Sequence, residues 1–303
     1  RILVIKHGAL GDFVLTTGPF KAIRAHHPRA QVTLMTSPAY AALGRACGWF
    51  DAVWEDSRPR SWDLAGWLAI AARLRGGRFD RVYDLQNSDR TRAYFFLLGR
   101  RRGEWSGIAP GCSHPHRNRA RGRMHTLDRQ AEQLEIAGIA SLPPPDLSWA
   151  DADVDGFALD GAFALMVPGG AAHRPDKRWP AARYIELARH LEARGMRPVL
   201  LGAAAEREVL AEIAAAVPGA LELCDKTSFA EIAALARGAR LALGNDTGPM
   251  HVIAACGCPT VVLFSAASDP VRTAPVGDHV SVLRRSSLAD LTAAEVGAAL
   301  RPR

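Results

Sequence analysis

A strand, a tight turn and a helix start are encoded by one octapeptide, Gly244-Asn245-Asp246-Thr247-Gly248-Pro249-Met250-His251. It follows the apolar run Ala239–Leu243 and precedes Val252–Ala255, so it joins a strand pattern to a helical one. A helix that starts on Asp246-Thr247-Gly248 points free backbone amides and the positive end of its dipole beyond the strand. Such a turn can hold a diphosphate and the sugar attached to it. An ordinary capped helix, with His251 on a surface or in a core, is the alternative interpretation.

Length and composition indicate a two-domain α/β enzyme. The 303 residues suit two domains of ordinary size better than one, and the apolar content of 48% is sufficient for two cores. No run of about 18 uncharged apolar residues occurs, so no segment is predicted to span a bilayer. The chain starts on a strand pattern, Arg1–Ile5, rather than on a signal peptide. We therefore expect a cytoplasmic protein.

The five cysteines do not form a zinc motif. Cys256-Gly257-Cys258 lacks a second ligand pair at zinc spacing, and the other three cysteines are scattered along the chain. Thiols in a reducing compartment are the expected state of all five. They are Cys47, Cys112, Cys224, Cys256 and Cys258.

A net charge of +7 indicates an anionic partner without identifying its kind. Much of the excess lies in one stretch from residue 100 to residue 123, where Glu104 is the only acidic residue. This basic stretch contains Arg100, Arg101, Arg102, Arg117, Arg119, Arg121 and Arg123.

Strand and helix patterns alternate in the first half, as is typical of an α/β fold. Strands are predicted at Arg1–Lys6, Gln31–Thr36, Asp51–Trp54 and Asp80–Leu85. Helices are predicted at Phe13–His26, Trp62–Arg75 and Leu127–Ala137. The region Gly99–His125 is rich in Arg, Gly and His, and predicts one or two loops.

A proline run and an acidic stretch then mark the boundary between two domains. We predict a first domain at 1–145, a linker at 146–160 and a second domain at 161–303, all without a sequence repeat between the halves. Strands of the second domain are predicted at Phe163–Val167, Pro198–Leu201, Leu221–Leu223, Arg240–Leu243 and Thr260–Phe264. Its helices are predicted at Ala181–Arg194, Ala205–Ala216, Phe229–Arg237, His251–Ala255 and Leu288–Leu300. The last of them is a candidate to pack back on the first domain.

A second glycine turn, Lys6-His7-Gly8-Ala9-Leu10-Gly11-Asp12, directly follows the first strand. Gly8 and Gly11 allow a ligand to approach the carboxyl end of that strand closely. The turn is not a dinucleotide fingerprint, because Leu10 and Phe13 stand where that pattern has small residues, and no Gly-Lys-Ser/Thr follows to make a Walker loop. What remains is one carboxylate, Asp12, at a helix start, which is either functional or a simple N-cap.

The first loop of the second domain, Pro168–Pro180, also follows a strand and precedes a helix. Its glycines and cations suit a phosphate-bearing ligand, although Lys177 and Arg178 can also be a solvated pair before a helix. The phosphate-loop candidates are Gly169, Gly170, His173 and Arg174, together with Lys177.

Together these motifs resemble glycosyltransferase family 9, the ADP-heptose:lipopolysaccharide heptosyltransferases, over nearly the whole chain. The resemblance rests on the Lys6–Asp12 turn with Leu15-Thr16-Thr17-Gly18-Pro19, on Asp176-Lys177-Arg178-Trp179-Pro180, and on Asn245–His251. Gly257–Phe264 and Ser268-Asp269-Pro270 continue it. The family implies a GT-B fold, in which two Rossmann-like domains face each other across a cleft. The N-terminal domain then binds the acceptor and the C-terminal domain binds the donor.

The resemblance also implies roles for single residues. Asp12 would be the catalytic base, Lys177 the contact to the donor phosphates, and Asp246 a contact to the donor sugar. The other donor-binding residues would be Glu206, Thr227, Thr247, Gly248 and His251. One departure concerns the donor: Ala172 and His173 stand where heptosyltransferases carry two hydroxyl residues before the lysine segment.

The reaction expected from these parts is an inverting glycosyl transfer from a nucleotide sugar, expected to be ADP-linked, without a cofactor. A carboxylate deprotonates an acceptor hydroxyl, and a cationic, amide-rich pocket stabilises the leaving diphosphate. No metal is expected, because the only Asp-x-Asp spelling, Asp151-Ala152-Asp153-Val154-Asp155, lies in the linker.

The expected acceptor is an anionic glycolipid or lipopolysaccharide core, with peripheral contact to the inner face of the inner membrane. Candidate acceptor residues are Gly8, Gly11, Arg117, Arg119 and Arg121, although the arginines can also be a general surface charge. Two rival functions stay open. One is a GT-B epimerase or hydrolase acting on a nucleotide sugar. The other is nucleic-acid binding, which has no motif in its favour.

Overall fold

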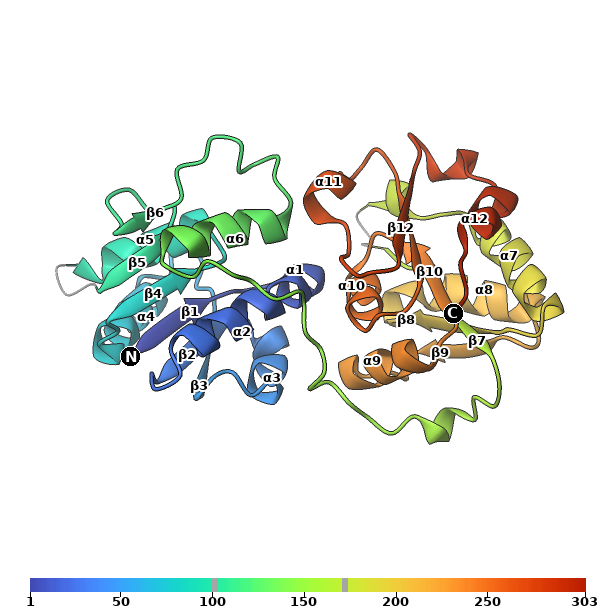
Figure 1. Ribbon diagram of the computed structural model, residues 1–303, viewed down its shortest axis with the longest axis horizontal. Helices are drawn as coiled ribbons and strands as arrows, with labels where there is room; N and C mark the ends of the chain where they lie inside the picture. Colours follow the sequence, from blue (N-terminus) through green and yellow to red (C-terminus); the bar gives the residue numbers. More distant parts are fainter. Residues whose placement is uncertain (100–102, 171–173) are drawn as a thin grey trace. The chain divides into compact units, whose positions relative to one another are not determined.

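Both halves of the chain fold into a six-stranded parallel sheet with helices on its two faces (Figure 1). The computed structural model describes residues 1–99, 103–170 and 174–303, and it contains two units, Arg1–Trp149 and Ala150–Arg303. The division between the units falls inside the stretch 146–160 that was predicted as a linker.

The first unit has the strand order β3-β2-β1-β4-β5-β6. The strands are β1 (Ile2–Ile5), β2 (Val32–Thr36), β3 (Ala52–Glu55), β4 (Arg81–Asp84), β5 (Glu104–Gly107) and β6 (His114–Pro115). The helices are α1 (Leu10–Leu15), α2 (Thr17–His26), α3 (Pro38–Ala46), α4 (Leu64–Gly77), α5 (Asp89–Leu97) and α6 (Thr126–Ile136). This is the Rossmann order, in which the chain reverses direction across the sheet between β1 and β4.

The second unit repeats the same topology with the order β12-β11-β10-β7-β8-β9. Its strands are β7 (Phe163–Val167), β8 (Arg197–Gly202), β9 (Leu221–Cys224), β10 (Leu241–Asn245), β11 (Thr260–Phe264) and β12 (Val280–Arg284). Its helices are α7 (Ala181–Ala193), α8 (Arg207–Ala216), α9 (Phe229–Gly238), α10 (Gly248–Ala255), α11 (Pro270–Thr273) and α12 (Ala293–Ala299). Two Rossmann-type units in one chain confirm the predicted α/β fold class, and the direction of the chain reverses here between β7 and β10.

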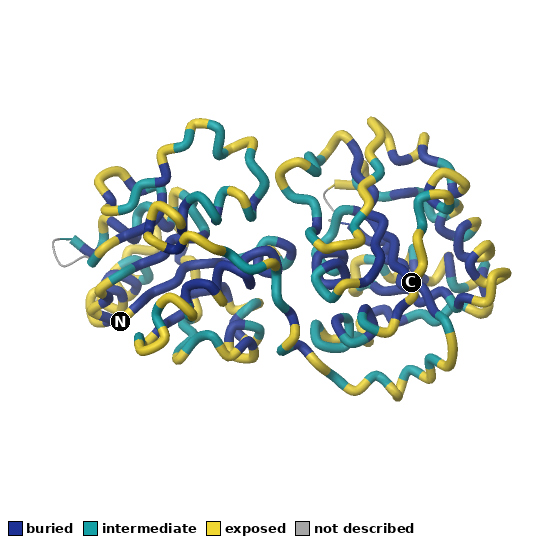
Figure 2. Tube along the Cα trace, in the orientation of Figure 1, coloured by how far each residue is buried: buried dark blue, intermediate teal, exposed yellow. Residues whose placement is uncertain are grey.

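Each sheet is buried on both faces, which explains why its strands are continuous apolar runs rather than alternating ones. Along β1, Ile2 and Val4 pack in one core with α2 and α6, while Leu3 and Ile5 pack in the other with α4 and α5. The strands at the centre of each sheet are therefore dark in the burial view of Figure 2.

Two predictions for the first unit were wrong in detail. The predicted helix Phe13–His26 is two helices, which meet at Thr16, where the threonine hydroxyl donates to the backbone oxygen of Asp12 at 2.6 Å. Helices α3 and α5 carried no boundaries in the prediction. The predicted loop Gly99–His125 contains β5 and β6, because Trp105 is fully buried beside β4 although its neighbours are not typical strand residues.

Smaller differences occur in the second unit. Strand β12 and the one-turn helix α11 were not predicted. The predicted helix Leu288–Leu300 begins as a 3₁₀ turn and becomes α12 only after Thr292, which accepts from the amide of Glu295 in a capping box. Helix α12 packs against α7 of its own unit, and its expected return to the first domain stays a prediction.

The stretch predicted as a linker is attached to the unit on either side of it. The carboxylate of Asp146 binds Lys21 at 2.5 Å, and its amide donates to Thr17. Gly18 lies so close to this return that a Cβ there would stand 2.2 Å from the carbonyl oxygen of Pro143. After the division, Arg237 donates to the carbonyl of Ala150 at 2.7 Å. Among the described residues, no helix is long and apolar enough to cross a membrane.

Candidate active site

The clearest pocket of the second unit lies at the carboxyl ends of β7 and β10, where the chain reverses direction across the sheet. Ligands of doubly wound sheets bind at this point because the loops on either side diverge there. The cavity measures about 440 Å³. It is lined by Val167, Gly169, Gly170, Lys177, Leu201, Gly202, Ala203, Glu206, Asp225, Thr227, Ile232, Asp246, Thr247, Gly248 and Pro249.

The predicted donor residues therefore largely converge on one cavity. Of the donor-binding candidates, Lys177, Glu206, Thr227, Asp246, Thr247 and Gly248 line it, as do Gly169 and Gly170 of the phosphate loop. Two other candidates among the described residues do not. Arg174 is exposed outside the lining, His251 is buried in α10, and His173 lies outside the described residues.

An ion pair forms the charged centre of this pocket. The ammonium Nζ of Lys177 lies 2.5 Å from Oδ2 of Asp246, and the side chains are only 13% and 9% exposed. Lys177 ends a 3₁₀ turn after β7, and Asp246 directly follows β10, so the sheet brings together two residues that are 69 positions apart. A cation held at this place can bind a phosphate oxygen without first being ordered.

The start of α10 adds hydrogen-bonding groups beside the pair. Thr247 is the N-cap of the helix, and its hydroxyl is buried without a hydrogen-bond partner among the described residues. The free amides of a helix start favour an anion. Gly244, the second-to-last residue of β10, has no room for a side chain, because a Cβ would lie 2.6 Å from Sδ of Met250 and 2.7 Å from Cβ of Val167.

Asn245 fixes the loop on the opposite side and is a residue to which the sequence pattern assigned no role. It is fully buried, and its amide group donates to the carbonyls of Pro168 and Gly169 at 2.7 and 2.9 Å. Its Oδ1 accepts from the backbone amide of Trp179 and from the hydroxyl of Tyr184. One side chain thus connects β10 to the loop that carries Lys177.

Two carboxylates occupy the far end of the pocket. Oε2 of Glu206 accepts from the amide of Ala203 at 3.0 Å, and Gly169 faces this side chain so closely that a Cβ would lie 2.6 Å from Cγ of Glu206. Asp225, which the sequence did not single out, follows β9 and binds the amide of Ala204 at 2.8 Å. Carboxylates positioned at strand ends in this way can accept hydrogen bonds from ribose hydroxyls.

The first unit carries Asp12 at the equivalent place, next to the carboxyl ends of β1 and β4. Asp12 is half-buried in the first turn of α1. Gly8 is required in the preceding turn, since its φ is +122° and a Cβ would stand 2.1 Å from the Tyr40 ring. Gly11 is buried in α1.

Lys6 is a further residue that the sequence did not single out. It follows β1 and is only 3% exposed. Burial lowers the pKa of its ammonium group, the carboxylates of Asp12 and Asp84 act in the opposite direction, and Arg129 lowers the pKa further. A buried cation thus lies within electrostatic reach of Asp12. Burial also raises the pKa of Asp84, at the end of β4, to about 6.

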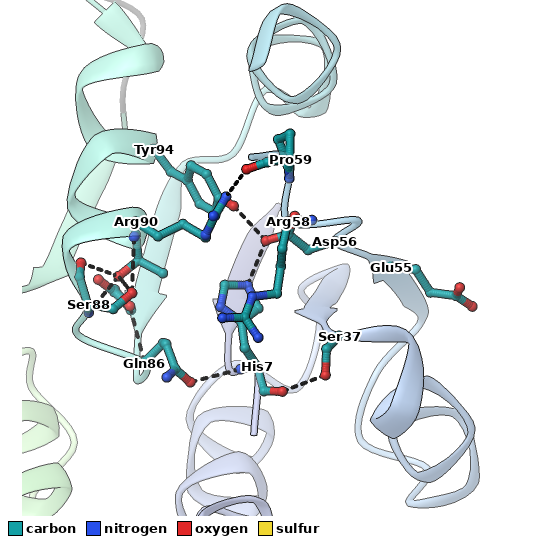
Figure 3. A network of polar contacts seen from close by, with 12 residues as sticks. His7, Ser37, Glu55, Asp56, Arg58, Pro59, Gln86, Ser88, Arg90 and Tyr94 are labelled. Atoms are coloured by element: carbon teal, nitrogen blue, oxygen red, sulfur yellow. Dashed lines mark hydrogen bonds and ion pairs between the residues drawn. The ribbon is translucent and has the colours of Figure 1, made fainter. Parts of the chain in front are cut away.

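A buried network around His7 holds the turn after β1 in place (Figure 3). Nε2 of His7 lies 2.9 Å from Oδ2 of Asp56, which also accepts from the hydroxyl of Tyr94 at 2.6 Å. Burial raises the pKa of Asp56, but the hydrogen bonds from His7 and Tyr94 outweigh it and leave the pKa below its usual value. The backbone of His7 is bound on both sides, by Gln86 and by Ser37.

The acceptor candidates of the basic stretch differ in their surroundings. Arg117 and Arg119 are exposed on the loop between β6 and α6, whereas Arg121 is half-buried. Burial lowers the pKa of Arg121, the neighbouring Arg129 lowers it further, and Asp84 raises it. Arg121 therefore lies within electrostatic reach of the same Asp84 as Lys6. Arg100, Arg101 and Arg102 lie outside the described residues.

Metal ligands do not gather in the part of the chain that the structure describes. No group of three or more His, Cys, Asp or Glu side chains there is arranged to hold a metal ion. Asp151 of the Asp-x-Asp spelling is exposed, 3.7 Å from Arg237. The expectation of metal-independent chemistry stays a prediction. All five cysteines are free thiols in this structure.

Comparisons with known proteins agree with this architecture. The sequence model of "Glycosyltransferase family 9 (heptosyltransferase)" matches residues 116–295. Lipopolysaccharide heptosyltransferase 2 of Escherichia coli K12 is 26% identical, and the alignment covers 94% of this chain and 88% of that protein. The solved structure of the E. coli ADP-heptose lps heptosyltransferase II is similar with a TM-score of 0.79 at 22% identity, over 99% of this chain and 97% of that one. A glycosyl transferase family 9 structure from Veillonella parvula gives 0.82 at 22% identity, over 99% and 95%.

Two Rossmann-type units, one of them with a polar pocket at its switch point that contains Lys177, have the GT-B fold. The chain belongs to glycosyltransferase family 9, the heptosyltransferase family, and is a glycosyltransferase.

Proposed function

We propose that this enzyme transfers a heptose from ADP-heptose to the core of lipopolysaccharide or a related anionic glycan, with inversion at the anomeric carbon. The observation that carries the proposal is the pocket of the second unit, which combines Lys177, Asp246 and the start of α10 in a member of the heptosyltransferase family. Its relatives include an enzyme named for ADP-heptose and lipopolysaccharide. ADP-heptose as donor and lipopolysaccharide core as acceptor are proposed by analogy with that enzyme.

The lining of the pocket supports an order of donor groups along it. Lys177, the hydroxyl of Thr247 and the amides at the start of α10 suit the diphosphate, because all are donors or cations in a largely buried site. Asp246 suits the sugar hydroxyls next to the diphosphate. The carboxylates of Glu206 and Asp225, at the far end, suit the ribose of the nucleoside, with Thr227 beside the base.

Asp12 is the proposed general base. Its carboxylate takes the proton of an acceptor hydroxyl, and the oxygen of that hydroxyl forms a bond to the anomeric carbon. The bond between that carbon and the diphosphate oxygen breaks, and the nucleoside diphosphate leaves with the electron pair, stabilised by Lys177.

The acceptor side of the proposal rests on charge. Lys6 places positive charge near Asp12, Arg121 places it near Asp84, and Arg117 and Arg119 extend it along the exposed loop. A phosphorylated or carboxylated core sugar is the acceptor chemistry that such a surface favours. A nucleic acid is the weaker candidate, because the family is one of glycosyltransferases.

Product analysis with and without acceptor tests the proposal. The enzyme is first offered ADP, UDP, GDP and TDP in a thermal-shift screen, in which ADP should give the largest rise in Tm. ADP-heptose is then supplied with a deacylated lipopolysaccharide core, and the product linkage is determined by NMR. We expect a glycoside of inverted anomeric configuration that forms only when the acceptor is present.

Two results would overturn the assignment. Consumption of ADP-heptose without acceptor, giving free heptose or an epimerised donor, would make the protein a hydrolase or an epimerase with the same fold. A preference for UDP, GDP or TDP would keep the transferase and change the donor. The other nucleotides are included in the screen because Ala172 and His173 stand where the family resemblance implies two hydroxyl residues.

A further inference from the structure

Helix α4 exposes an apolar face that no described element covers. Trp62, Leu64 and Leu68 are 75%, 71% and 63% exposed, although the opposite face of the same helix packs Ile70 and Leu74 into a core. Leu64 and Leu68 are one turn apart, and the alanines at 65, 69 and 72 are exposed around them. A helix that is apolar on both faces has a second partner. We call Trp62, Leu64 and Leu68 the α4 patch.

Arginines precede and follow this patch along the chain. The segment from Arg58 to Arg78 contains five arginines and one aspartate, a net charge of +4, and all five arginines are exposed. The aspartate, Asp63, caps α4 by accepting from the amide of Gly66. Arg60 lies over the ring of Trp62, at 5.4 Å from its centroid. Tryptophan and leucine with flanking arginines are the composition of surfaces that enter the interface of an anionic bilayer.

The α4 patch lies at the same edge of the sheet as Asp12. Helices that connect parallel strands start at the carboxyl edge, so the first turn of α4 and the turn after β1 share that edge. A chain of contacts connects them (Figure 3). Arg90 donates to the carbonyl of Pro59 at 3.0 Å, just before the patch, and the amide of Arg58 donates to Asp56. Asp56 in turn holds His7, two residues before the Ala9–Leu10 start of α1.

We infer that the α4 patch docks this enzyme on an anionic phospholipid bilayer, with the edge that carries Asp12 directed toward membrane-anchored acceptors. The inference rests on the proposed function for the nature of the acceptor, but the binding of the patch to a bilayer does not depend on it. Charge decides between partners: a tryptophan and two leucines in a segment of net charge +4, with Arg60 over the tryptophan ring, fit acidic headgroups above acyl chains.

Vesicle co-sedimentation tests this inference. The full chain is mixed with vesicles of phosphatidylcholine containing 30% phosphatidylglycerol, and in parallel with pure phosphatidylcholine. The variant Trp62→Ser/Leu64→Ser/Leu68→Ser is compared with Val271→Ser, a residue of α11 that is 64% exposed and serves as the matched control. Circular dichroism, thermal unfolding and binding of ADP report whether each variant folds. Sedimentation equilibrium without lipid reports self-association.

We expect the wild type and Val271→Ser to bind the anionic vesicles, and to bind less in 0.5 M salt or on pure phosphatidylcholine. The triple variant should partition at least about tenfold more weakly, since burial of even one leucine side chain is worth more than a tenfold change in an equilibrium constant. Its kcat on a deacylated acceptor should equal that of the wild type, while its rate on a vesicle-embedded acceptor falls.

Three results would overturn the inference. One is equal vesicle binding by the triple variant and the wild type. Another is an absence of binding by the wild type to anionic vesicles. The third is a wild-type dimer that the triple variant cannot form, which would make a second copy of the chain the partner of the patch. Failure of the proposed function is distinguishable from these, because the enzyme would still bind vesicles yet transfer no sugar to either acceptor.

Discussion

Replacing Lys177 with alanine should weaken the binding of a nucleoside diphosphate by about 10- to 150-fold. Lys177 is the only cation among the described residues that line the pocket, which otherwise contains the carboxylates of Glu206, Asp225 and Asp246. A hydrogen bond to a charged group contributes about 1.5–3 kcal/mol, and each 1.4 kcal/mol corresponds to a factor of ten in Kd.

The variant also leaves Asp246 without its partner, and this effect must be separated from the loss of the cation. In the free enzyme, Asp246 is 9% exposed and lies 2.5 Å from the lysine. A double-mutant cycle of Lys177→Ala, Asp246→Asn and the double variant makes the separation. Isothermal titration with ADP gives Kd for each, and Lys177→Arg serves as the conservative control that keeps the charge.

We expect the double variant to bind ADP as weakly as Lys177→Ala, because both lack the cation that contacts the phosphates. Asp246→Asn alone should bind ADP at least as tightly as the wild type, since its lysine is released for the ligand. Two results would refute this reasoning. The first is a Kd for Lys177→Ala within about twofold of the wild type. The second is recovery of wild-type affinity in the double variant, which would mean that the lysine acts only by neutralising Asp246.

Three further outcomes are expected. Asp12→Asn should lower kcat by about 10²- to 10⁴-fold with unchanged Kd for ADP, and a kcat within fivefold of the wild type would remove the base role. Burial raises the pKa of Asp84 from 3.8 to about 6, so between these values the folded state keeps a proton that the unfolded state has lost. The free energy of unfolding therefore falls as the pH rises from about 4 to about 6. Relative to the wild type, Asp84→Asn should therefore gain up to about 3 kcal/mol in urea unfolding between about pH 4 and pH 7, and a pH-independent difference would contradict this. Charge reversal of Arg117, Arg119 and Arg121 should raise the acceptor KM and leave the donor KM unchanged, whereas equal effects on both would remove the acceptor role.

Most of the sheet architecture could be predicted, because strands buried on both faces are written as continuous apolar runs. Nine of the twelve strands in the described residues lie within or overlap predicted ones. The exceptions are β5, β6 and β12. Strand β5 is Glu104-Trp105-Ser106-Gly107, and it is a strand because it pairs with β4, with Trp105 fully buried. Its local residue preferences do not favour that state.

The donor pocket was largely predictable for a related reason. Strand, glycine turn and helix start follow one another directly in the sequence, so Lys177, Asp246 and Thr247 could each be identified locally. Residues without such a signature were missed. Asp225 follows a short strand, and no glycine turn or helix-start motif adjoins it. Lys6 precedes a turn in which the glycines, rather than the lysine, are the recognisable feature.

His251 and Arg174 were predicted for the donor site, but the structure places neither in the lining of the pocket. His251 is three residues into α10, and the direction of its side chain is set by the 100° rotation of the helix per residue. The motif cannot show which side of the helix faces the cavity, because that depends on how α10 packs against β10 and α9.

Local chemistry, read along the chain, determined the class of this protein: two alternating α/β halves, a glycine turn with a carboxylate in one, and a phosphate-type loop with a capped helix in the other. Those features depend on neighbours in sequence and on the periodicity of strands and helices. Tertiary structure alone brought Lys177 to 2.5 Å from Asp246, buried Lys6 within reach of Asp12, and left the α4 patch exposed. Each of these depends on which strands are adjacent and which faces are covered. Contacts between residues tens of positions apart leave no local pattern from which they could be predicted.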